Sequence, residues 1–199
     1  MLAPTIVNRS AFGSVILVTG GPSRSSIIMV LPKPSMGEIT DLLERFRRGA
    51  ELLAVATTGA AGPELDFKPA PEKWCVRQIV CHLADTEAVY VMRLRQVLAE
   101  DTPVLRSFNG DAWAEKLDYG RRKISHALET FRVLRAENYE LLKGMPEEAF
   151  QRPCTHAEDG RWTLRDLVLN NAHHLEDHVK QIQVVRAAYR ESRAKQAVG

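Results

Sequence analysis

Hydrophobic residues recur every three or four positions over four long stretches of the chain, the spacing that places them on one face of an α-helix. The stretches cover about residues 35–58, 72–100, 121–143 and 162–192. The last has the clearest apolar stripe, which consists of Leu164, Leu167, Val168, Leu175, Val179, Ile182 and Val185. Four such amphipathic helices in one chain predict an all-α fold, a four-helix bundle.

The connections between the helices predict their order in space. The second connection, about residues 101–120, is longer than a turn between antiparallel neighbours needs. A crossover of this length lets two successive helices run parallel. We therefore expect an up-down-down-up bundle with a long crossover between helices two and three. Residues 59–71 and 145–161 contain glycine and proline and predict irregular links.

Residues 1–36 differ in character from the rest of the chain. Two short apolar runs, 15–18 and 27–31, flank a segment rich in glycine and serine. Neither run is long enough to span a bilayer, and the match to a signal peptide is poor. We expect a loosely ordered N-terminal extension over residues 1–36 and a bundle domain over residues 37–199.

Composition narrows the class of protein. With 45% hydrophobic and 26% charged residues, the 199-residue chain has the make-up of a soluble globular domain. Its 27 basic and 25 acidic residues give a formal charge of +2, too small to indicate a nucleic-acid partner. Three cysteines at no zinc-finger spacing do not form a disulfide framework, so a cytoplasmic location is expected, with no membrane partner. A homodimer is compatible with the sequence.

Histidines give the first sign of chemistry. His174 and His178 lie on the apolar stripe of the last helix, one turn apart, whereas His173 turns away from it. Core histidines are often satisfied by hydrogen bonds alone. Two adjacent imidazoles, however, leave up to four ring nitrogens in need of partners, and a shared cation satisfies two at once. Since a bound metal normally takes three or more protein ligands, the pair requires a third ligand from elsewhere.

His82, at the border of the apolar stripe of the second helix, is the candidate for that ligand. If helices two and four ran parallel, His82 would lie about 9 Å along the axis from the histidine pair. If they run antiparallel, as the long crossover predicts, the gap is about 4 to 5 Å, which side chains can bridge. Asp85 and Asn171 each lie one turn from a histidine and are the candidates to orient the imidazoles by hydrogen bonding. A solvated carboxylate is an equally good interpretation of Asp85.

Four short motifs carry a resemblance to a known family. They are Trp74-x-x-Arg77-x-x-Val80-x-His82-Leu83-x-Asp85-x-Glu87, Asp111-x-Trp113, Trp162-Thr163-Leu164-Arg165 and His174-x-x-x-His178-x-x-Gln181-Ile182. Over roughly residues 37–188 the chain resembles the DinB-like, YfiT-like family of metal-dependent four-helix bundles. The resemblance implies that His82, His174 and His178 bind a divalent metal, zinc or nickel. The wider family includes thiol-dependent transferases and isomerases, so the resemblance also implies these activities as candidates.

Three neutral histidines leave the +2 charge of the ion uncompensated and a coordination position open. We therefore expect a metal-dependent hydrolase or a thiol S-transferase acting on a small molecule, with a low-molecular-weight thiol as a partner in the second case. Glu87 and Glu176 are candidate bases, but the sequence assigns neither. A non-catalytic metal-binding module and a stress-linked interaction bundle, in which the histidines only specify packing, are the alternatives.

Overall fold

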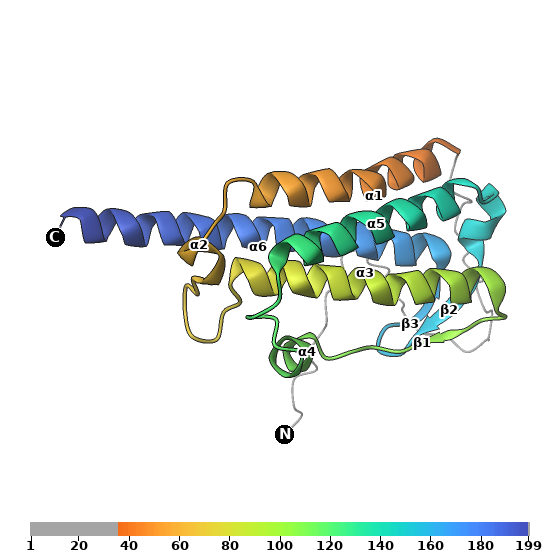
Figure 1. Cartoon of the computed structure of the whole chain (residues 1–199). Coiled ribbons are helices and arrows are strands. Elements are labelled where there is room, and N and C mark those ends of the chain that lie inside the picture. Colours follow the sequence, from red (N-terminus) through yellow and green to blue (C-terminus); the bar gives the residue numbers. More distant parts are fainter. Residues whose placement is uncertain (1–35, 199) are drawn as a thin grey trace, which may run out of the picture. The chain divides into compact units, whose positions relative to one another are not determined.

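The computed structural model describes residues 36–198. Four long helices lie side by side in it: α1 (Met36–Thr57), α3 (Val76–Ala99), α5 (Ile124–Lys143) and α6 (Leu164–Val198) (Figure 1). The predicted all-α four-helix bundle is therefore confirmed. The extension expected over residues 1–36 lies outside the described residues, apart from Met36, which opens α1. None of the helices within residues 36–198 has the length and apolar character to cross a membrane.

Side-chain contacts give the directions of α3 and α5. Arg77, near the start of α3, donates to the carbonyl oxygen of Arg122, just before α5. Further along both helices, Glu87 of α3 accepts a hydrogen bond from Arg135 of α5. Residue numbers rise together along the two helices, so α3 and α5 run parallel.

Helix α6 runs in the opposite direction to α3. His82 contacts His174, whereas Tyr90, two turns further along α3, donates to Asn170, one turn earlier in α6. The crossover from α3 to α5 and the return in α6 thus bring residues 82 and 174 together although 92 positions separate them.

Helix boundaries differ from the prediction at three places. Helix α3 begins at Val76 and not near residue 72, because Cys75 and Gln78 form a capping box that fixes its first turn. Helix α5 begins at Ile124 and not near residue 121, which belongs to a turn over residues 117–121. Helix α6 does not end near residue 192 but continues to Val198, past the ends of its neighbours (Figure 1). Its last residues are mostly alanine, arginine, lysine and glutamine, which favour helix.

The crossover and the two links expected to be irregular contain short ordered elements. They are α2 (Pro63–Asp66), β1 (Val104–Leu105), α4 (Gly110–Lys116), the 3-10 helix η1 (Glu147–Gln151), β2 (Pro153–His156) and β3 (Gly160–Thr163). The strands form a sheet in the order β1-β2-β3, with β1 parallel and β3 antiparallel to β2. This sheet joins the crossover to the link before α6, at the end of the bundle where α6 begins (Figure 1).

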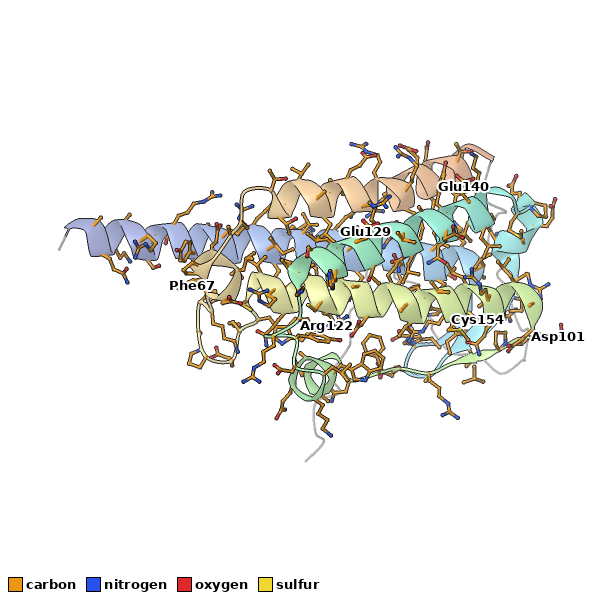
Figure 2. All side chains as sticks on the ribbon, in the orientation of Figure 1. Phe67, Asp101, Arg122, Glu129, Glu140 and Cys154 are labelled. Atoms are coloured by element: carbon orange, nitrogen blue, oxygen red, sulfur yellow. The ribbon has the colours of Figure 1, made fainter. Side chains whose placement is uncertain are left out.

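The buried apolar side chains form two clusters, and each cluster draws on all four long helices; Figure 2 draws the side chains on the ribbon. All seven residues of the apolar stripe predicted for the last helix are buried. The third helix differs. Its hydrophobic spacing predicts an apolar stripe of Ile124, Leu128, Phe131, Leu134, Tyr139 and Leu142, but Leu128 and Leu134 are only half-buried. Arg135 and Asn138 of α5 lie in the interior in their place.

A buried ion pair connects all four helices. Arg135 and Glu87 are 2% and 1% exposed and lie 2.7 Å apart. Glu87 also accepts from Asn138 at 3.0 Å and, more weakly, from Asn171 of α6 at 3.4 Å. The Arg135 guanidinium donates in addition to the carbonyl oxygen of Phe46 in α1. Because both charges are removed from water, their mutual pairing is essential to the stability of the interior.

Candidate metal centre

Three imidazoles meet between α3 and α6. The Nε2 atom of His174 lies 3.2 Å from Nε2 of His82 and 3.2 Å from Nε2 of His178. One ring nitrogen of each histidine lies within 4.8 Å of the other two. The structure thus brings together the three histidines that the sequence selected.

Helix geometry positions this histidine cluster, which we define as His82, His174 and His178. The two histidines of α6 are one turn apart on its inner face and project in the same direction. The antiparallel packing of α3 supplies the third ring from the facing helix. His82 is only 6% exposed, and the other two are half-buried.

The nitrogen spacing fits one metal ion. Four-coordinate zinc binds imidazole nitrogen at about 2.0–2.1 Å, which places neighbouring nitrogen ligands about 3.3 Å apart. The observed 3.2 Å agrees with that value for two of the three pairs. Three imidazoles are also a ligand set found in zinc enzymes, and imidazole suits nickel as well.

Burial keeps the three rings neutral. Removal from water, together with the neighbouring imidazoles, lowers the pKa of His82 to about 4 and that of His174 to about 3. Removal from water likewise lowers the pKa of His178, although the hydrogen bond to Gln181 opposes it. Near pH 7 each ring is therefore neutral and keeps one unprotonated nitrogen that can bind a cation.

The hydrogen bonds behind the histidines differ from those expected. Nδ1 of His178 lies 2.7 Å from the amide oxygen of Gln181, one turn further along α6. Nδ1 of His82 is buried and has no hydrogen-bond partner within residues 36–198. Gln181 was present in the family motif, but its spacing of three residues from His178 is the signal that could have assigned it this role.

Neither residue expected to orient an imidazole hydrogen-bonds to one. Asp85 accepts hydrogen bonds from Tyr119 at 2.7 Å and from Arg122 at 2.8 Å. This places Asp85 in an ion pair, which differs from both interpretations of its sequence position. Asn171 instead donates to Glu87 in the bundle interior.

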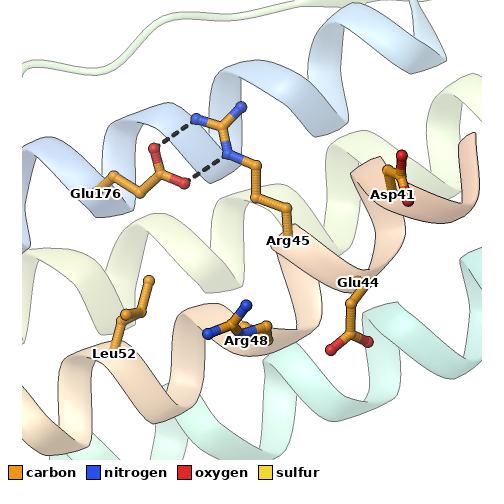
Figure 3. Close-up of a pocket in the computed structure, with 6 residues that line it drawn as sticks. All are labelled: Asp41, Glu44, Arg45, Arg48, Leu52 and Glu176. Atoms are coloured by element: carbon orange, nitrogen blue, oxygen red, sulfur yellow. Dashed lines mark hydrogen bonds and ion pairs between the residues drawn. The ribbon is translucent and has the colours of Figure 1, made fainter. Parts of the chain in front are cut away.

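The two candidate bases are also engaged elsewhere. Glu87 belongs to the buried ion pair with Arg135. Glu176 forms two hydrogen bonds with Arg45, which also contacts the exposed His173. Arg45 and Glu176 line a surface hollow of about 390 Å³ on α1 and α6 that contains none of the three clustered histidines (Figure 3). The geometry therefore gives neither glutamate a contact with the histidine cluster.

Aromatic and backbone groups enclose the cluster on the side of α4. The ring of Trp74 lies 6.2 Å from that of His178 and almost parallel to it, and 4.9 Å from that of His82. A Cβ atom at Gly110 would lie 3.1 Å from Cε1 of His82 and 3.6 Å from Cη2 of Trp74. The absence of a side chain at Gly110 is thus what lets the start of α4 approach His82 so closely.

Two antiparallel helices of the bundle present three neutral imidazoles to one point. This fold and site define a class of helical-bundle proteins whose site is suited to a divalent metal ion. The sequence profile of the DinB superfamily matches residues 33–182. The chain belongs to this superfamily.

Individual relatives carry a common description. A protein of Oceanobacillus iheyensis named "putative metal-dependent hydrolase" is 28% identical over 151 residues, which cover 73% of this chain and 87% of that protein. YfiT of Bacillus subtilis, with the same description, is 30% identical over 109 residues, which cover 55% of this chain and 59% of YfiT.

The solved structure of YfiT is similar in fold. It superimposes with a TM-score of 0.71 at 24% identity and covers 82% of this chain and 90% of its own. That structure is described as "a probable metal-dependent hydrolase with an unusual four-helix bundle topology". The similarity shows that the two chains share the bundle fold.

Proposed function

We propose that the protein is a metal-dependent hydrolase of a small molecule and that His82, His174 and His178 hold its divalent ion, zinc or nickel. The observation that carries the proposal is the approach of three Nε2 atoms from two helices, with 3.2 Å between His174 and each of the others. The common description of the relatives supports the same reaction class.

A divalent ion held by three neutral ligands supplies Lewis acidity, which acidifies a water or thiol and polarises a carbonyl group. The remaining work falls to the chain itself. Gln181 fixes the ring orientation of His178, since a hydrogen bond at the second nitrogen of a ligating imidazole sets its tautomer. Trp74 and the backbone at Gly110 shield His82 from water.

The first test is the metal content of the purified protein by elemental analysis. We expect about one zinc or nickel ion per chain, and its loss in His82→Ala and His178→Ala. His126→Ala is the matched control, because His126 is exposed and outside the cluster. Wild-type protein without metal after incubation with zinc and nickel would refute the proposed site.

The second test separates hydrolysis from thiol transfer. The metal-loaded protein is supplied with activated esters and amides, with and without a small thiol. Turnover that requires no thiol supports a hydrolase, whereas strict dependence on the thiol would replace it by an S-transferase. Metal bound without turnover in either assay would favour a non-catalytic metal-binding module.

A further inference from the structure

Three aromatic side chains adjoin the histidine cluster directly or through one another, and we call this group the ring row: Trp74, Phe108 and Trp113. Trp74 lies against His82 and His178, as described above. The ring of Phe108 lies 6.1 Å from that of His82, and Trp113 lies 4.6 Å from Phe108. Two separate segments, the residue before the α3 capping box and the stretch that leads into α4, thus each place an aromatic ring against His82.

The ring row is not a closed part of the core. All three side chains are half-buried, so each keeps part of its surface accessible. Neither Trp74 nor Trp113 has a hydrogen-bond acceptor for its indole N–H among residues 36–198. Tryptophan N–H groups in a fully packed interior usually find an acceptor. In the same part of the chain, no cationic side chain lies over any of the three rings.

The position of the row depends on Gly110. Gly110 lies between Phe108 and Trp113 in the sequence, and its backbone packs against the ring of His82. A larger residue would push the start of α4 outward and separate the ring row from the histidines. The close approach therefore keeps the accessible aromatic surface next to the imidazoles.

Charge decides which kind of ligand fits. Aromatic rings bind both cations and neutral rings. With three neutral imidazoles as ligands, however, a divalent ion keeps its positive charge, which repels a cationic group nearby. A neutral aromatic group is therefore the better match, with an oxygen or nitrogen acceptor within reach of an indole N–H.

We propose that Trp74, Phe108 and Trp113 form the specificity pocket of the site and bind a neutral aromatic group of the substrate while its reactive polar group faces the histidine cluster. The assignment rests on the proposed metal site and adds the substrate class to it.

The experiment uses nickel-loaded full-length protein and two probes with the same metal-binding group, acetohydroxamate and 2-naphthohydroxamate. Their dissociation constants are measured by calorimetry for the wild type and for Trp113→Ala. Trp113 is chosen because its recorded ring contact is with Phe108 and not with a histidine. The matched control is Trp162→Ala, since Trp162 is also half-buried but stacks on His156.

We expect the wild type and Trp162→Ala to bind the naphthyl probe at least about tenfold more tightly than the acetyl probe. In Trp113→Ala the ratio should fall below about threefold with the nickel content unchanged. Equal affinities in metal-loaded wild type would overturn the aromatic pocket and leave the metal site intact. Loss of nickel in Trp113→Ala would also overturn it, because the rings would then only support the ligands. Wild type that takes up no nickel would show instead that the underlying metal site is wrong.

Discussion

Replacement of Glu87 by glutamine tests the buried ion pair. The substitution keeps the size of the side chain but leaves the guanidinium of Arg135, 2% exposed, without its counter-charge. Glu87 accepts two strong hydrogen bonds, at 2.7 Å from Arg135 and 3.0 Å from Asn138. Loss of one partner of a buried pair costs about 3 to 5 kcal/mol. We expect Glu87→Gln to lower the free energy of unfolding by about that amount.

Urea denaturation followed by circular dichroism measures the change. Glu129→Gln is the matched control. Glu129 pairs with Arg132 at the same distance of 2.7 Å, but the two side chains are 60% and 62% exposed, respectively. The control should unfold at the urea concentration of the wild type, since exposed pairs contribute little. The double variant Glu87→Gln with Arg135→Met removes the stranded charge and should regain part of the lost stability.

A Glu87→Gln protein within about 1 kcal/mol of the wild type would refute the reasoning. It would mean that Arg135 finds another partner or that water reaches it. Equal losses for Glu87→Gln and Glu129→Gln would show that burial does not govern the strength of these pairs.

Three further outcomes are expected. In a competition assay for metal, Gly110→Ala should bind about tenfold more weakly than the wild type, because its methyl group would lie 3.1 Å from the ring of His82. The control Gly120→Ala should bind metal normally, because the nearest atom to its methyl group would be 3.8 Å away. In urea denaturation, Gly49→Ala should lower the free energy of unfolding by about 1 to 3 kcal/mol, since its methyl would collide with a δ-methyl of the buried Leu175. An unchanged midpoint would contradict this packing. Protein treated with EDTA should lose stability as the pH falls from about 6.5 towards 4, because the histidines of the unfolded chain take up protons that the buried His82 and His174 of the folded chain do not. The urea midpoint should therefore depend less steeply on pH in His174→Phe than in the wild type. An equal pH dependence in the two proteins would refute the cause.

The hydrophobic periodicity of the sequence predicted the four long helices and their packing into a bundle. The stripe on the last helix and the length of the crossover were enough to place His82 opposite His174 and His178, because helix geometry converts sequence spacing into position. The same periodicity failed in α5. There it selected Leu134, whereas the structure buries the neighbouring Arg135, since a charge can enter the core when a partner on another helix neutralises it.

The groups around the histidines were harder to predict for a related reason. Asp85 was one turn from His82, but its actual partners come from the segment before α5, 34 and 37 residues away. Phe108 and Gly110 reach His82 only because the crossover folds back over α3. Such contacts depend on the path of the connecting segments, which carries no periodic pattern in the sequence.

Because His82 and His174 are 92 positions apart in the sequence, the proposed metal ion would also act as a cross-link. A bond that closes a loop of this length reduces the number of conformations open to the unfolded chain, by the same principle as a disulfide, for which the gain is about 4 to 5 kcal/mol. The cysteines of the described chain are free and buried, so no covalent bridge supplies this restraint there. In the metal-loaded protein, the proposed ion would fasten α3 to α6, so the stability of the fold would depend on the supply of metal.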